Sequence, residues 1–274
     1  MSLPPWLLEH CSRLESKDEE LTNLNLNTRK LSDAMMYALA AAIQQNSHLL
    51  VLNLTSSLVN TSNALTVFAD QLPDQSSLKV LHLSYNRLEN VSSFGRMLER
   101  NSSLVEIFLD YNSIEPAAAC QLADGLANNG TLQVFRLNSN RIGNEGCQAL
   151  AEALTENKSL KTLTVSRNHI GSAGADALER SLQKNMTLQN VGLDKNDILP
   201  DQESRIQLLC RANRAGRRYL RQKDFAVAIW PTMLAKLDIE LFYFFFRAKP
   251  DLGRTMRQQP DSNKRKRNDF DAET

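Results

Sequence analysis

Apolar residues recur along this chain with a period of about 28 residues, and each copy places them at its first, fourth and sixth positions. Leu104, Ile107 and Leu109 show the pattern. Alternation of this kind predicts a short strand with one buried face. Self-similarity at a fixed period is typical of stacked repeats. Seven copies align on their first residue, at Leu21, Leu49, Leu78, Leu104, Leu132, Leu160 and Leu188.

A polar residue follows each predicted strand, at the ninth position of the copy, and it is asparagine in the last five copies. A short amide side chain can satisfy turn backbone groups that no neighbouring strand reaches. We therefore expect a structural ladder of stacked amides rather than a ligand site. The first two copies carry Arg29 and Ser57 instead, and the third copy is two residues short. The ladder residues are Asn86, Asn112, Asn140, Asn168 and Asn196.

A helical pattern follows the turn, and it is clearest from Gly146 to Leu154 and from Gly174 to Leu182. Leucines four residues apart, with alanines between them, form a narrow apolar stripe that can lie close to a sheet. An asparagine stands three places before the next copy, and asparagine tolerates the left-handed conformation that often ends a helix. We expect left-handed helix ends at Asn101, Asn129, Asn157 and Asn185.

Stacking these units predicts an α/β solenoid with the strands on its inner side. Neighbouring strands lie about 4.8 Å apart, whereas a helix is about 10 Å wide, so the two layers cannot stack in step along a straight line. The expected solenoid is curved, with parallel strands on the concave face and helices on the convex face. Outward-pointing strand side chains then line a concave surface that such proteins use for binding.

The same residues resemble a known family. The 28-residue period, with Asn-x-Ile-Gly-x-x-Gly at Asn140 to Gly146 and again at Asn168 to Gly174, resembles the leucine-rich repeat and looks like its ribonuclease-inhibitor-like subclass. The resemblance covers about residues 21–215. It implies a curved right-handed solenoid with helical caps, and it implies little about function.

The ends of the stack need covers, because a solenoid exposes apolar edges at both termini. Residues 1–20 are expected to form an N-terminal helical cap, since Pro4 and Pro5 can open a helix and Trp6, Leu7, Cys11 and Leu14 follow at helical spacing. Residues 21–215 then form the seven repeats. Residues 216–252, rich in aromatic side chains, are a C-terminal helical cap or a docking segment. Residues 253–274 are expected to be a disordered tail.

Composition favours an intracellular protein. Cys147 falls among core positions of a predicted helix, which suggests a buried thiol in a reducing compartment. The N-terminus lacks the pattern of a signal peptide, and the longest apolar stretch, Ala34 to Ile43, is too short to span a bilayer. We expect a cytoplasmic location, with a nuclear one as the alternative, since a basic run could serve as an import signal. That run is Lys264, Arg265, Lys266 and Arg267.

Charge and motifs argue against several functions. Residues 201–274 contain 16 Lys and Arg against 10 Asp and Glu, a net +6, which leaves −5 on residues 1–200. An acidic solenoid does not favour nucleic acid as the ligand of the concave face. The sequence shows no phosphate-binding glycine loop, metal-spaced cluster or nucleophile motif, so we expect no catalytic, cofactor-binding or metal-binding residues and no enzyme activity.

The sequence instead predicts a protein-interaction scaffold that binds an intracellular protein partner on the concave face, as a monomer without a membrane anchor. Two alternatives remain open. One is a GTPase-activating protein, because one such family has similar repeats, although its strongly acidic tail has no counterpart here. The other is a sensor or adaptor subunit that recruits partners through residues 216–252.

Strand alternation points several aromatic and charged residues outward as candidate contacts for a protein partner. They are Val80, His82, Tyr85, Glu106, Phe108, Asp110, Tyr111, Val134 and Arg136, with Ser84 and Asn138 beside them.

Overall fold

The computed structural model describes residues 3–57, 62–72, 77–217 and 239–248. They belong to two compact units, Met1–Arg214 and Ala215–Thr274. The first unit contains all seven repeats. In the second unit, the described residues include one helix, α10 (Ile239–Ala248), in which Leu241 is buried and Tyr243 is exposed. The predicted tail at 253–274 and its basic run lie outside the described residues, as does most of segment 216–252.

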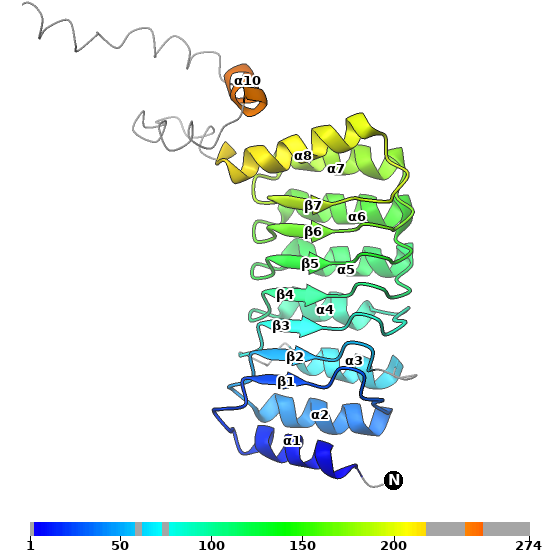
Figure 1. The fold of residues 1–274 in the computed structure, drawn as a ribbon, viewed down its shortest axis with the longest axis vertical. Helices are drawn as coiled ribbons and strands as arrows, with labels where there is room; N and C mark the ends of the chain where they lie inside the picture. Colours follow the sequence, from blue (N-terminus) through cyan, green and yellow to red (C-terminus); the bar gives the residue numbers. More distant parts are fainter. Residues whose placement is uncertain (1–2, 58–61, 73–76, 218–238, 249–274) are drawn as a thin grey trace, which may run out of the picture. The chain divides into compact units, whose positions relative to one another are not determined.

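The first unit is built on a parallel sheet whose strands follow one another in chain order (Figure 1). Each strand has three residues, and its central residue is buried. Neighbouring strands pair at equivalent repeat positions, so that Leu81 lies opposite Ile107 and Ile107 opposite Phe135. The strands are β1 (Asn23–Asn25), β2 (Val51–Asn53), β3 (Val80–His82), β4 (Glu106–Phe108), β5 (Val134–Arg136), β6 (Thr162–Thr164) and β7 (Asn190–Gly192).

A row of helices covers one face of this sheet (Figure 1). Each of α2 to α7 connects one strand to the next, whereas α1 precedes β1 and α8 follows β7. The result is the α/β solenoid that the sequence predicts, with the other face of the strands uncovered within the unit. We call that uncovered face, over β1–β7, the strand face. The helices are α1 (Pro5–Glu15), α2 (Asp33–Gln45), α3 (Ser62–Gln71), α4 (Ser92–Arg100), α5 (Pro116–Asn128), α6 (Gly143–Glu156), α7 (Ser172–Lys184) and α8 (Pro200–Arg214).

The core lies between the sheet and the helices and repeats with the sequence. In the fifth copy, Leu132, Phe135 and Leu137 are completely buried, as is Leu150 on α6 behind them. Cys147, also on α6, is 1% exposed, and burial raises the pKa of its thiol to about 12. The thiol therefore stays protonated at neutral pH and packs as a small apolar side chain.

The first asparagine ladder is confirmed. The side-chain amide of Asn140 donates to the Leu109 carbonyl of the preceding repeat at 3.0 Å, and its oxygen accepts from the backbone N–H of Ile114 at 3.1 Å. Asn168 repeats the arrangement with Leu137 and is fully buried. Each amide thus joins two turns that have no strand partner there, which links neighbouring repeats.

The prediction of left-handed helix ends was wrong. Asn101, Asn129, Asn157 and Asn185 are all extended, with φ between −77° and −66° and ψ between 127° and 131°. Each side chain is buried and forms a second ladder instead. The Asn157 amide donates to two carbonyls of the preceding repeat, and its oxygen accepts from the N–H groups of Ser159 and Leu160. The asparagine is needed here for its four hydrogen bonds rather than for its backbone freedom.

Helix α1 lies at the first end of the stack and packs against α2. It buries Leu7, Cys11 and Leu14, which share one side of the helix. The side-chain amide of Asn46, at the end of α2, donates to the Leu14 carbonyl at 3.0 Å. The second ladder therefore extends from the repeats into this helix.

The helix of the short third copy makes a close backbone contact with the next helix. Its helix α4 has nine residues, against 13 in α5 and 14 in α6. Gly95 of α4 faces Gly125 of α5 so closely that a Cβ added at Gly125 would lie 2.0 Å from the Gly95 oxygen. The two backbones can lie this close together only because neither residue has a side chain.

Candidate protein-binding face

The strand face carries its largest side chains over β3, β4 and β5. Strand pairing puts His82 opposite Phe108 and Phe108 opposite Arg136, so these residues form one row across three strands. The His82 and Phe108 rings stack with centroids 4.3 Å apart and planes 22° apart. The Arg136 guanidinium lies over the Phe108 ring, with its Cζ 5.4 Å from the ring centroid.

A second aromatic pair lies where the strands end. The rings of Tyr85 and Tyr111 stack with centroids 4.3 Å apart and planes only 9° apart. Tyr85 remains 53% exposed and Tyr111 44% exposed, so each stacked ring still offers surface to a partner. Both residues have positive φ, 61° and 56°, which is uncommon for a bulky residue. Sequence reasoning did not foresee this left-handed turn, although the equivalent residue of every copy adopts it.

Asp110 holds this part of the face in place. It is only 6% exposed, and one carboxylate oxygen accepts from the Arg136 Nε at 2.9 Å. The other oxygen accepts from the backbone N–H of Asn138 at 2.8 Å. Asn138 in turn accepts from the N–H of Ser166 in the next repeat. Asp110 is thus a support for Arg136 and the adjoining turn, with little surface of its own for a partner.

The remaining predicted contacts flank this centre. Val80, Glu106 and Val134 lie opposite one another in the first outward row and are half-buried. Ser84 is buried beside Tyr85. The structure therefore brings all the predicted contact residues together on three neighbouring repeats, some on the strands and some in the turns that follow. It separates them into exposed side chains and buried supporting ones.

The electrostatics of the row are mixed. Burial lowers the pKa of His82, repulsion from Arg136 acts in the same direction, and attraction by Glu106 opposes both. The imidazole is accordingly neutral at pH 7 and behaves as a flat aromatic surface. Rings lying beside one fixed guanidinium suit contact with a protein surface, whereas they supply no converging nucleophile and base.

Two further features are absent from the described residues: a cluster of metal-ligand side chains and a membrane-spanning helix. No group of three or more His, Cys, Asp or Glu is placed to hold a metal ion in the ranges that the structure describes. Within the same ranges, no helix has the length and hydropathy needed to cross a bilayer.

Comparison with known proteins identifies the repeats. The model of the leucine-rich repeat family matches residues 128–151 and 156–178, which contain β5 and β6 and the first parts of α6 and α7. No curated protein matches the sequence. Two solved structures are similar in fold: a leiomodin-1 actin-binding site 2 and a tropomodulin C-terminal domain from Caenorhabditis elegans.

Both structural likenesses are weak. The leiomodin-1 structure shares 17% identity at a TM-score of 0.45, over 80% of this chain and 95% of its own. The tropomodulin domain shares 14% identity at a TM-score of 0.38, over 78% of this chain and 97% of its own. At these values the likeness carries no functional assignment. The seven parallel strand-and-helix units and the family match agree, and the chain is a leucine-rich repeat protein.

Proposed function

We propose that this protein is a non-enzymatic scaffold that binds an intracellular protein partner on the strand face, around Tyr85, Phe108, Tyr111 and Arg136. The observation that carries the proposal is the exposed, stacked Tyr85–Tyr111 pair beside the row formed by His82, Phe108 and Arg136. Stacked repeats are generally binding modules, and tyrosine and arginine are enriched among the residues that dominate binding energy.

The arrangement is also suited to binding because it is preorganised. Each tyrosine ring is restrained by the other, and Arg136 is fixed by Asp110 and Phe108. Immobilising a flexible side chain on association costs about 0.5–1.5 kcal/mol, so side chains already held in place lose less. A partner meeting this face would gain contact area without ordering the residues that supply it.

A double variant tests the site. Full-length protein carrying Tyr111→Ala and Arg136→Ala is immobilised beside the parent, and proteins captured from cell lysate are compared by quantitative mass spectrometry. We expect specific capture to be lost while far-UV circular dichroism is unchanged. Arg180→Ala with Lys184→Ala is the control, because both side chains are exposed on α7, in the helix layer and away from the strand face. Equal capture by parent and double variant would contradict the proposed site.

The other functional predictions remain proposals with separate tests. A scaffold should not accelerate GTP hydrolysis by small GTPases, whereas a GTPase-activating protein should.

Removal of residues 216–252 tests the adaptor hypothesis. An adaptor would lose a co-purifying complex while the repeats keep their melting temperature. A large loss of stability would instead favour a C-terminal cap. Membership of the ribonuclease-inhibitor-like subclass, a monomeric state and the cytoplasmic or nuclear location also remain predictions.

A further inference from the structure

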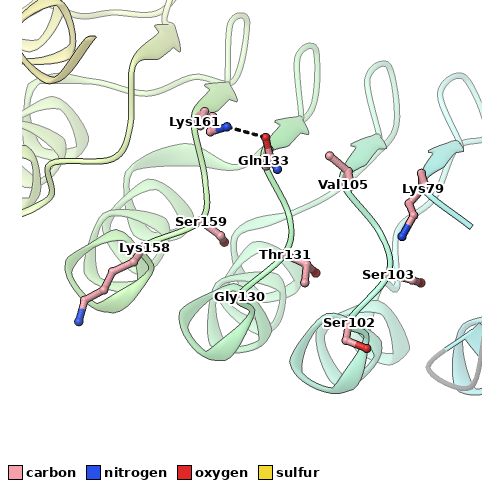
Figure 2. A pocket seen from close by; sticks show the side chains of 10 residues that line it. All are labelled: Lys79, Ser102, Ser103, Val105, Gly130, Thr131, Gln133, Lys158, Ser159 and Lys161. Carbon is pink, nitrogen blue, oxygen red and sulfur yellow. Dashed lines mark hydrogen bonds between the residues drawn. The ribbon is translucent and has the colours of Figure 1, made fainter. Parts of the chain in front are cut away.

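A basic groove lies at another edge of the repeats, where the helices lead into the strands (Figure 2). Its volume is about 410 Å³, and it crosses the loops that precede β4, β5 and β6. In Figure 2, Lys158 and Lys161 lie at one end of the labelled band and Lys79 at the other. The lining residues are Lys79, Ser102, Ser103, Val105, Gly130, Thr131, Gln133, Lys158, Ser159 and Lys161.

The charge of this groove is one-sided. Three of its lining residues are lysines and none is acidic, although residues 1–200 as a whole carry a net −5. Lys79, Lys158 and Lys161 are exposed, and none of them forms an ion pair with a described residue. The Lys161 ammonium donates to the Gln133 amide oxygen at 2.8 Å and keeps two further protons for another acceptor. A lining that has positive charge and no carboxylate attracts an anionic ligand.

Several polar groups of the groove already form hydrogen bonds within the fold. The Ser159 hydroxyl donates to the Asn129 carbonyl at 3.1 Å, and Thr131 and Ser103 hydroxyls contact the same ladder of asparagines. The backbone N–H groups of Gln133 and Lys161 donate to carbonyls of the preceding repeat. These hydroxyl protons and N–H groups are already used within the fold. The groups left to meet a ligand are chiefly the three ammonium groups.

Spacing decides what kind of anion fits. Lys79 precedes β3 and Lys161 precedes β6, so three strand spacings of about 4.8 Å put their backbones about 14 Å apart. One phosphate group is too small to meet both ends. An extended peptide rises about 3.3 Å per residue and turns alternate side chains to one side, so acidic residues at positions one and five lie about 13 Å apart on the same side.

We infer that this groove binds an extended acidic peptide segment of a protein, with carboxylates about four residues apart meeting Lys79 at one end and Lys158 and Lys161 at the other. The site is separate from the centre of the strand face, and its ligand class follows from charge and length. Exposed charge pairs are individually weak and are screened by salt, so the binding is modest and falls at high ionic strength.

The test uses a fluorescein-labelled Glu-Ser-Glu-Ser-Glu peptide and fluorescence anisotropy. All variants are full-length chains in which Lys264, Arg265, Lys266 and Arg267 are changed to Gln, since that run could itself attract the probe. Adding Lys79→Gln, Lys158→Gln and Lys161→Gln is expected to weaken binding about tenfold. Lys30→Gln, Lys184→Gln and Lys195→Gln change the net charge equally on exposed lysines outside the groove and should leave binding within about twofold.

Three further measurements distinguish this inference from binding of clustered carboxylates, of a single anion or of a membrane. Ser-Glu-Glu-Glu-Ser, with the same composition, should bind more weakly because its carboxylates are clustered; equal binding overturns the spacing argument. Millimolar inorganic phosphate should not displace the probe, and displacement would indicate a site for a single anion. Vesicles of phosphatidylcholine and phosphatidylserine should not bind in a manner dependent on the three lysines, and such binding would assign the groove to a membrane.

Failure of this inference is distinguishable from failure of the proposed function. The Tyr111→Ala and Arg136→Ala protein should bind the acidic probe as its parent does, because neither residue lines the groove. Equal probe binding by the two lysine triple variants would overturn the groove and leave the strand-face proposal standing. Circular dichroism confirms that each triple variant is folded before binding is measured.

Discussion

The contact between α4 and α5 and the strand face over β3 and β4 belong to the same two repeats, yet they use side chains in opposite ways. Between the helices, Gly95 and Gly125 leave no room even for a methyl group. On the strand face, Tyr85 and Tyr111 stack and still expose about half of their surface. One region is filled by backbone alone, and the other presents large side chains that the fold does not need for its core.

This difference separates stability from binding. A change on the helix layer or in a ladder removes contacts that exist only in the folded chain, so it should lower the free energy of unfolding. A change at an exposed residue of the strand face removes little buried area, so it should leave the fold intact and alter binding to the partner. Substitutions in the two regions should therefore have opposite effects on stability and on binding.

The largest loss of stability is expected for Asn157→Ala in the second ladder. The residue is 2% exposed, and its amide forms two bonds to the preceding repeat and two within its own loop. Buried groups left without partners cost about 1–3 kcal/mol each, and some will be reached by water, so we expect a loss of about 4 kcal/mol. Urea unfolding followed by circular dichroism measures it. A loss below about 1 kcal/mol would mean that the ladder is not a structural support.

Gly125→Ala should have the next largest effect. Its new methyl group would meet the backbone of Gly95, which cannot move aside as a side chain could. Overpacking typically costs about 1–3 kcal/mol, and contact with backbone places this case near the upper value. Gly130→Ala is the matched control, because a Cβ there meets nothing within 4 Å. Similar melting temperatures for the two variants would show that the helices can separate at no cost.

Arg136→Ala is expected to reduce stability only slightly while affecting binding strongly. It leaves the Asp110 carboxylate with its backbone partner at Asn138 but without the guanidinium. Because Arg136 is 44% exposed, water can replace part of that interaction, and we expect a loss of about 1 kcal/mol. Thermal unfolding and partner capture should therefore respond differently. A loss of several kcal/mol would make Arg136 a support of the fold and weaken its assignment as a contact.

Tyr111→Ala should show the smallest change in stability. It removes one member of an exposed stacked pair, for which about 0.5–1 kcal/mol is expected. Tyr111→Phe retains the ring and serves as the control for the hydroxyl group. If capture of the partner survives in Tyr111→Phe but not in Tyr111→Ala, the ring is the binding element. Loss of the fold in Tyr111→Ala would remove the contrast between the two regions.

Much of this architecture could be read from the repeat. Because side chains alternate along a strand, Ile107 and Leu109 had to share one face, and their neighbours Glu106 and Phe108 had to share the other. The helix ends were misjudged for a physical reason. Asn157 can act through its backbone or through its amide, and a sequence shows no partner atoms that would distinguish the two.

The sequence by itself determined the period, the buried leucines and the set of residues that point outward, because these follow from local spacing alone. Only the tertiary structure decided that Asp110 supports Arg136, that Gly125 meets Gly95, and that Lys79 shares a groove with Lys161. Those contacts join residues 26 or more positions apart, and their existence depends on how the repeats are stacked in register. The physical reason is that alternation is a property of one segment, whereas contact is a property of two.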